Sequence, residues 1–186
     1  PFGHKAKSAH DMGREYRILN QLNAGFPYCP KAYVHCTDES VIGSEFYVME
    51  RVNGIILRAD LPAELNFSPE QTTQLCKSFI DKLVELHNVD YQACGLGDLG
   101  KPEGYVARQI SGWSDRYEKA LTPDAPLWTE VKAWLNEKMP ADHPKPAIVH
   151  NDYRFDNVIL DPHDPQRIIG VLDWELTTLG DPLMDL

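Results

Sequence analysis

A cluster of polar residues lies between short apolar runs near the carboxyl end of the sequence. The stretches VHNDYRFDNVILD and LDWE carry His150, Asp152, Asp156, Asn157 and Asp173. Polar groups beside a buried strand must be hydrogen-bonded or must handle charge, because an unpaired polar group in a core is costly. The cluster therefore indicates either a hydrogen-bonded structural network or a chemical site.

If these side chains converge, they supply the groups that phosphoryl transfer needs. A hairpin through DPHDPQ would bring Asn157 and Asp173 to neighbouring strand ends, so that an amide oxygen and a carboxylate face one point. Oxygen ligands of this type suit Mg²⁺, which is usually bound by one or two protein groups together with substrate phosphates. Asp152 would lie in front of that metal and accept the proton of an incoming hydroxyl. Such a combination is typical of phosphoryl transfer to an alcohol.

Two parts of the chain must position this cluster, with the boundary between residues 53 and 54. In the first part, residues 11–22 have apolar positions near helical spacing and predict a helix. Residues 31–37 and 45–52 read as two strands joined by a polar connection. The segment 1–53 is therefore expected to form a small lobe with a helix, a small sheet and a hinge.

The second part, residues 54–186, reads as mainly helical up to the polar cluster. Ser68 followed by Pro69 and Gln71 predicts a capped helix that runs to about His87. Two further helices are expected to follow, and the short runs AIVH, NVIL and RIIGVLD predict strands around the cluster. Asp181 and Pro182 resemble the N-cap and first residue of another helix.

Bulk properties exclude several classes of partner. The 28 acidic residues against 18 basic ones give a formal net charge of −10, which would repel a phosphate backbone, so nucleic acid is not expected. No apolar run approaches the ~18 residues of a membrane span. The four cysteines are far apart without metal-ligand spacing, which favours reduced thiols in the cytoplasm. The sequence sets no oligomeric state.

The pattern from His150 through Asp152 to Asn157, followed by Asp173, resembles the catalytic loop and metal-binding Asp of kinase-like folds. The last triplet is Asp-Trp-Glu rather than Asp-Phe-Gly, and with GDPLMDL after it resembles the aminoglycoside phosphotransferase and choline kinase family. REYRIL, FYVMERVNG and LVELHNVD resemble further segments of that family. GLGDLGKPEGYVARQISGWSDRY is similar to the subgroup found alone in bacteria and fused to acyl-CoA dehydrogenases in animals.

This resemblance implies an α+β, protein-kinase-like fold with two lobes, and it assigns roles to the cluster. Asp152 would be the catalytic base, and Asn157 and Asp173 would be the magnesium ligands. His150 would support the loop. The implied cofactors are therefore ATP and Mg²⁺.

The resemblance also implies roles in the first lobe. Glu15 would pair with a lysine that grips the phosphates, and the backbone of Glu50, Arg51 and Val52 would contact the adenine. The family's glycine-containing loop and lysine strand precede this helix, and nothing before Glu15 resembles them. Lys5 and Lys7 lie in a loop-like segment and are not assigned to that role. We therefore expect a lobe without its first strands, a second lobe without its last helices, and a chain that is part of a longer polypeptide.

Each of these residues also has a plain structural explanation. A core histidine bonded to a backbone carbonyl explains His150, and we favour that role for it. Taken singly, Asp152, Asn157 and Asp173 suit turns, but their joint spacing favours the chemical site. Glu15 could instead be an exposed helix carboxylate in a charge network.

Aromatic residues at helical spacing are predicted mainly as core, with a substrate pocket as the alternative. These residues are Trp113, Tyr117, Trp128 and Trp134.

The preferred interpretation is an enzyme that moves the γ-phosphoryl group of ATP to a hydroxyl of a small molecule. A hydroxylated acyl or acid compound is preferred as acceptor over a cationic aminoglycoside or choline. The main alternative is a non-catalytic nucleotide-binding or scaffolding module of the same fold. A metal-dependent phosphoesterase that uses His150, Asp152 and Asp173 fits less well, because it would need more metal ligands around a water nucleophile.

Overall fold

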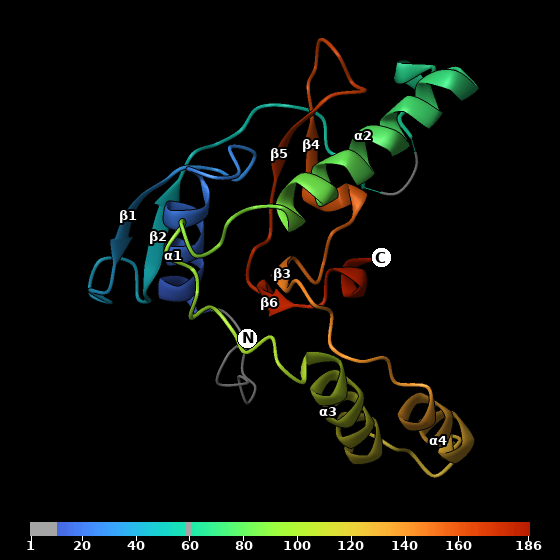
Figure 1. Cartoon of the computed structure of the whole chain (residues 1–186). Coiled ribbons are helices and arrows are strands. Elements are labelled where there is room, and N and C mark those ends of the chain that lie inside the picture. Colours follow the sequence, from blue (N-terminus) through green and yellow to red (C-terminus); the bar gives the residue numbers. More distant parts are fainter. Residues whose placement is uncertain (1–10, 59–60) are drawn as a thin grey trace.

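The structure is a computed structural model that describes residues 11–58 and 61–186; Lys5 and Lys7 lie outside the described residues. Helix α1 (Met12–Leu22) packs beside the antiparallel strands β1 (Ala32–Cys36) and β2 (Phe46–Met49), as Figure 1 shows. The Asp11 carboxylate caps α1 by accepting the Arg14 backbone N–H at 2.9 Å. This unit confirms the helix and the small sheet expected from the sequence.

Helix α2 (Pro69–His87) begins at the predicted capping box. The Gln71 N–H donates to the Ser68 hydroxyl at 3.3 Å, and the Ser68 N–H donates back to the Gln71 side chain at 2.9 Å. The buried face of α2 carries Leu75, Leu83 and Leu86. This face packs against strands β3 (Ala147–Val149) and β5 (Ile168–Val171).

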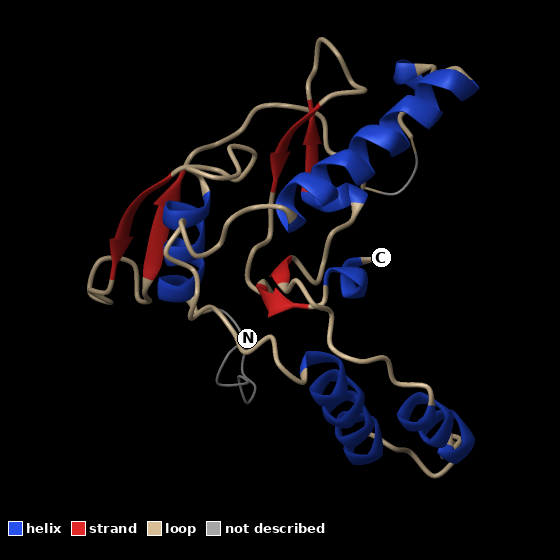
Figure 2. Cartoon of the chain, viewed as in Figure 1, coloured by secondary structure: helices blue, strands red, loops and turns tan. Residues whose placement is uncertain are grey.

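Helices α3 (Tyr105–Lys119) and α4 (Thr129–Glu137) form a hairpin that projects away from the rest of the chain (Figure 2). The prediction that their aromatic residues are core is wrong for three tryptophans. Trp113, Trp128 and Trp134 are 63%, 53% and 58% exposed. Helical spacing places aromatic side chains on one face of a helix, but it does not tell whether another element covers that face.

Short buried strands frame the polar cluster. Strand β4 (Val158–Leu160) pairs with β5, and β3 pairs with β6 (Thr178–Gly180), both in antiparallel register. Strand β6 was not predicted, because Thr178–Gly180 contains only one large apolar residue, whereas the equally short β3 and β4 are continuous apolar runs. A 3₁₀ helix at Pro182–Asp185 follows it, and the Asp181 carboxylate caps this helix by accepting the Leu183 N–H at 2.9 Å. The cap expected at Asp181 is therefore confirmed, on a shorter helix.

One hydrophobic core unites the elements before and after residue 53. Its members include Ile18, Leu22, Leu86, Ile148, Leu160 and Trp174. A backbone hydrogen bond joins the two parts as well, since the Val171 N–H donates to the Tyr28 carbonyl at 2.7 Å. Just after the boundary, the Ile55 N–H donates to the Leu160 carbonyl at 2.9 Å, and the Leu160 N–H donates back at 2.8 Å. The boundary between residues 53 and 54 stays a prediction. Among the described residues, none of the helices combines the length and apolarity that crossing a bilayer requires.

Gly54 permits this backbone approach, and its replacement should destabilise the fold. A Cβ at Gly54 would lie 2.4 Å from both the Ile159 Cγ2 atom and the Leu160 carbonyl oxygen. We therefore expect Gly54→Ala to lower the free energy of unfolding by about 1–3 kcal/mol. The control is Gly112→Ala inside α3, where an added Cβ meets Arg116 at an ordinary 3.4 Å. Urea denaturation of both variants measures the difference, and equal midpoints would contradict the prediction.

Candidate active site

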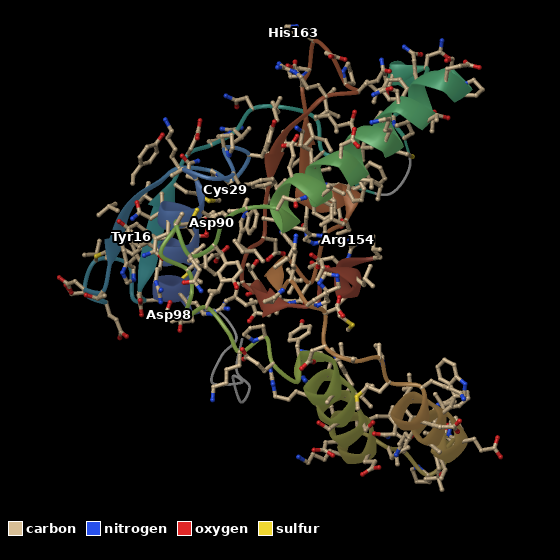
Figure 3. The ribbon with its side chains drawn as sticks, viewed as in Figure 1. Tyr16, Cys29, Asp90, Asp98, Arg154 and His163 are labelled. Atoms are coloured by element: carbon tan, nitrogen blue, oxygen red, sulfur yellow. The ribbon has the colours of Figure 1, made fainter. Side chains whose placement is uncertain are left out.

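The β4–β5 hairpin brings Asn157 and Asp173 to the same end of two paired strands. Val158 lies opposite Val171, and the Leu172 N–H donates to the Asn157 carbonyl at 2.8 Å. The turn of the hairpin projects in the other direction, with His163 at its tip (Figure 3). The juxtaposition expected from the spacing is therefore present, because a tight antiparallel pair fixes which residues face each other.

Asp152 and Asn157 are joined directly. The Asn157 Nδ2 group donates to the Asp152 carbonyl and to its carboxylate Oδ2, at 2.9 Å each. These bonds orient the Asn157 amide with its oxygen turned away from Asp152. The side chains of a candidate base and of a candidate metal ligand are thus held in one arrangement.

Asp173 lies two residues after the end of β5 and has an unusual backbone conformation. Its φ is +67°, in the left-handed region that few non-glycine residues adopt, and its side chain is exposed. The next residue, Trp174, anchors the turn, since its ring is 1% exposed and its indole N–H donates to the Val171 carbonyl at 2.9 Å. Strain of this kind persists only where the surroundings hold it.

Glu15 on α1 supports the same turn from the other side. Its carboxylate accepts hydrogen bonds from the Tyr47 hydroxyl and from the Trp174 backbone N–H. Burial raises the pKa of Glu15 above its ordinary value, and the nearby Asp173 and Glu175 carboxylates act in the same direction. Glu15 is therefore not the exposed helix carboxylate of the alternative reading; its pairing with a lysine stays a prediction.

Arg14, the neighbour of Glu15, ties α1 to the segment after Asp173. Its guanidinium donates to the Glu175 carbonyl at 2.9 Å and to the Thr177 carbonyl. Burial lowers the pKa of Arg14 from its ordinary value. The sequence analysis did not identify this residue, because a partner more than 160 positions away leaves no signal in local spacing.

The candidate hinge lies between β2 and the segment that pairs with β4. The Glu50 N–H donates to the Lys31 carbonyl at 2.8 Å, and Arg51 is exposed while Val52 is half-buried. The Ile55–Leu160 pair holds the end of this hinge against β4, the strand that follows Asn157 directly. Contact of this backbone with adenine stays a prediction.

His150 has the structural environment that the sequence favoured. It is 0% exposed, and its ring Nε2 lies 2.9 Å from the Leu172 carbonyl while the Asp152 N–H donates to its Nδ1 at 3.3 Å. Burial lowers the pKa of His150, which favours the neutral ring. Since Nε2 faces a carbonyl and Nδ1 faces a backbone N–H, the proton of the neutral ring belongs on Nε2. The ring thereby links the loop that carries Asp152 to the end of β5.

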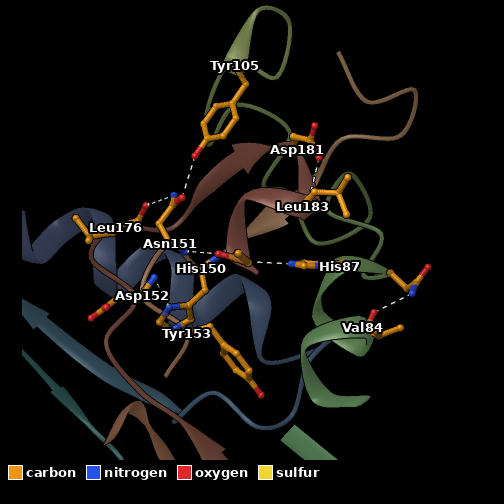
Figure 4. A network of polar contacts seen from close by, with 12 residues as sticks. Val84, His87, Tyr105, His150, Asn151, Asp152, Tyr153, Leu176, Asp181 and Leu183 are labelled. Carbon is orange, nitrogen blue, oxygen red and sulfur yellow. Dashed lines mark hydrogen bonds and ion pairs between the residues drawn. The ribbon is translucent and has the colours of Figure 1, made fainter. Parts of the chain in front are cut away.

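Asp185 is a further residue of this site that the sequence analysis missed. Its carboxylate has 0% side-chain exposure. It accepts the backbone N–H of His150 at 2.8 Å, that of Asn151 at 2.7 Å, and the His87 ring Nε2–H at 2.9 Å. Figure 4 shows this network around the loop. In the sequence, GDPLMDL predicts the start of a helix and contributes to the family resemblance, but nothing in its spacing relates Asp185 to His150.

The donor set suits a magnesium ion that also binds substrate phosphates. Among residues 11–58 and 61–186, no three His, Cys, Asp or Glu side chains come together as a metal site. The Asp173 carboxylate and the Asn157 amide oxygen are hard ligands of the kind that Mg²⁺ accepts in pairs. A cage of protein ligands around a water nucleophile, as the phosphoesterase alternative needs, is not provided by these residues.

Comparisons with known proteins show the family to which this chain belongs. The model of the phosphotransferase enzyme family APH matches residues 1–186. Acyl-CoA dehydrogenase family member 11 of Gallus gallus is 41% identical over 188 residues, which cover 100% of this chain and 23% of that protein. The chain thus spans about a quarter of the length of this curated relative.

Solved structures share the fold. A candidate aminoglycoside phosphotransferase from Ralstonia eutropha superposes with a TM-score of 0.81 at 41% identity, over 92% of this chain and 52% of that one. A streptomycin–ATP ternary complex of an aminoglycoside phosphotransferase gives 0.61 at 20% identity, over 93% and 57% of the two chains, and supports the fold alone. From the family match, the identity to relatives and the kinase-like fold together, this chain belongs to the phosphotransferase enzyme family.

Proposed function

We propose that this chain is the catalytic part of a small-molecule kinase that transfers the γ-phosphoryl group of ATP to a hydroxyl group. The observation that carries the proposal is the convergence of Asp152, Asn157 and Asp173 at one end of the β4–β5 hairpin. Family membership supports it, since a base, an amide and a carboxylate in this arrangement serve phosphoryl transfer.

In the proposed reaction, the acceptor oxygen forms a bond to the γ-phosphorus while the bond from that phosphorus to ADP breaks. Asp152 orients the acceptor hydroxyl and takes its proton. Its carboxylate is suited to this task because the bond from Asn157 fixes one of its oxygens. Asn157 and Asp173 would hold Mg²⁺, which when bound offsets the charge on the phosphates.

The nucleotide would lie between the two parts of the chain. The backbone of residues 50–52 would contact adenine, and Glu15 would pair with a lysine that holds the phosphates. In the proposed orientation, the phosphates reach Asp173 beside Glu15. The proposed use of a nucleotide follows the analogy of fold, since a solved structure with the same fold is a ternary complex with ATP and streptomycin.

A groove along α3 and α4 supports a largely apolar acceptor. It encloses about 840 Å³ and is lined by Ile110, Trp113, Tyr117, Trp128, Val131, Leu135 and Met184, among others. Arg116 and Lys132 also line it, and Lys132 forms an ion pair with Glu118, so Arg116 is the lining cation that an anionic group on the ligand would meet. A hydroxylated acyl or acid compound fits this combination better than a cationic aminoglycoside or choline. Relatives named as acyl-CoA dehydrogenases are consistent with an acyl acceptor.

The proposed location is the cytoplasm, where ATP is available. All four cysteines are free thiols in the structure, which agrees with a reducing compartment.

Calorimetric titration of ATP with and without Mg²⁺ tests the metal site. We expect magnesium to tighten ATP binding, and Asp173→Asn to weaken that magnesium-dependent binding by about tenfold or more, because a carboxylate ligand is lost. Equal magnesium dependence in the variant and the unaltered protein would contradict the assignment of Asp173.

Turnover measurements test the base. Asp152→Asn should keep ATP binding but lower kcat by about 10²–10⁴-fold, the usual contribution of a positioned base. Unchanged kcat would rule out this role. ATP binding without turnover of any hydroxylated acceptor would instead favour the non-catalytic module.

Removal of the Asp185 charge should harm both stability and turnover. The Asn side chain has one uncharged acceptor oxygen and an NH₂ group that can only donate, so it cannot replace both carboxylate oxygens. Asp185→Asn is therefore expected to lower the free energy of unfolding by about 1–3 kcal/mol and to lower kcat. Asp81→Asn is the matched control, because Asp81 makes an exposed ion pair with Lys77 on α2. Denaturation and initial rates are the measurements, and equal behaviour of the two variants would contradict the prediction.

The groove assignment is tested by acceptor selectivity. Trp113→Ala should raise KM for a long-chain hydroxy acid several-fold and leave KM for ATP unchanged, since Trp113 lines the groove on α3, and the α3–α4 hairpin projects away from the small sheet and the hinge (Figure 2). The screen compares hydroxy fatty acids with choline and an aminoglycoside. Preference for the cationic acceptors would overturn the proposed substrate class.

A further inference from the structure

Asn151 lies between the buried His150 and the candidate base Asp152, and it has a strained backbone. Its φ is +64°, in the left-handed region, which asparagine tolerates at some energetic cost. This conformation turns the chain out of β3 and sets the direction in which Asp152 leaves the strand. The position of Asp152 therefore depends on the contacts that hold Asn151.

Three hydrogen bonds hold Asn151. Its backbone N–H donates to Asp185 at 2.7 Å, and its Nδ2 group donates to the Leu176 carbonyl at 2.9 Å. Its Oδ1 accepts the Tyr105 hydroxyl at 2.9 Å, as Figure 4 shows. The first two partners follow Asp173 in the chain, but Tyr105 belongs to α3, the helix that carries the apolar groove.

Tyr105 is itself held firmly. It is 4% exposed, and its ring packs so closely on Gly180 that a Cβ there would lie 2.7 Å from the ring. The residue before it, Gly104, has a φ of +65°, and its N–H donates to the Asp142 carboxylate at 2.8 Å. Burial raises the pKa of Tyr105, so its hydroxyl remains a donor. The hydroxyl therefore transmits the position of α3 to Asn151.

Residues close to the groove along the chain supply contacts of Asn151. Gln109 and Ile110, one turn beyond Tyr105 on α3, line the groove, and so does Met184, which directly precedes Asp185. Two of the three bonds on Asn151 thus come from residues next to groove-lining side chains.

We propose that Tyr105 is a positioning residue that couples the α3–α4 hairpin to Asp152 through Asn151. The inference rests on the proposed function for the role of Asp152, but the contact itself is independent of it. A shift of α3 when the groove is filled would reach the loop through this hydroxyl. Its loss should affect the chemical step, while nucleotide affinity, which depends on the hinge and the metal ligands, should stay the same.

The test is Tyr105→Phe, which removes the hydroxyl and keeps the ring on Gly180. We expect the kcat of Mg²⁺–ATP turnover to fall about three- to tenfold, the effect of one hydrogen bond, with KM for ATP unchanged. Amide hydrogen exchange at Asn151 and Asp152 should accelerate by a similar factor. Tyr28→Phe is the matched control, because it also removes one hydroxyl bond, to Lys82 at 2.7 Å, away from this loop.

A double-mutant cycle separates coupling from general packing. Asn151→Gly keeps the left-handed backbone but removes the acceptor of the Tyr105 hydroxyl. In that background, Tyr105→Phe should have no further effect on kcat or on exchange. An equal effect of Tyr105→Phe in both backgrounds, or exchange at residues 151 and 152 that matches the unaltered protein, would overturn the proposal.

The hydrogen-exchange measurement tests the coupling through Tyr105 separately from the proposed kinase function. If the protein turns over no acceptor and hydrolyses no ATP, the kinase proposal falls. Exchange that still accelerates in Tyr105→Phe alone would then support the coupling, and unaltered exchange would reject it.

Discussion

The buried carboxylate of Asp185 is the interaction on which the geometry of the site depends. A charge without solvent exposure is expensive unless several donors compensate it. Here two consecutive backbone N–H groups, of His150 and Asn151, and the His87 ring meet that need. The Asp185 carboxylate therefore holds α2, the start of the loop at residues 150–157 and the last 3₁₀ helix together. Asp152, the candidate base, directly follows the two residues that this carboxylate fixes.

A second set of contacts joins the small sheet to the site. Arg14 and Glu15 extend from α1 to the carbonyl groups of residues 175 and 177 and to the Trp174 N–H. These hydrogen bonds hold α1 in a fixed position against the turn at Asp173. Glu15 also places a third carboxylate near Asp173 and Glu175, and the pKa of Glu15 is raised mainly by burial and further by the negative charge of these two carboxylates. The proposed magnesium ion and a cationic side chain would relieve that repulsion.

Strain accompanies both halves of the site. Asn151 and Asp173 adopt left-handed backbone conformations, one beside the candidate base and the other at a candidate metal ligand. Hydrogen bonds of Asn151 itself hold the first conformation, and the hydrogen bond of Trp174, the residue after Asp173, holds the second. These contacts offset the cost of the two conformations. The unstrained scaffold around them is the pair of short sheets and the core that includes Trp174.

The features that could be predicted from the sequence are those whose interacting residues lie close together along the chain. The capping box of α2 and the approach of Asn157 to Asp173 could be predicted, because a helix start and a tight hairpin are local and their geometry follows from spacing. The structural environment of His150 was also expected, since a histidine between apolar residues next to a strand is usually buried. The roles of Glu50, Arg51 and Val52 came only from resemblance and stay predictions.

Tertiary structure alone decided the rest. Asp185 and Tyr105 lie 34 and 46 positions from Asn151, and Arg14 lies 161 positions from Glu175. The spacing of the aromatic residues around α3 and α4 predicted that they are buried, but the tryptophans are exposed, because exposure depends on which other elements pack against them. The sequence by itself determined which chemical groups are present and which local turns bring some of them together. Only the packing of distant segments decided how those groups are held, since contacts across a core depend on the arrangement of whole elements and leave no pattern in local spacing.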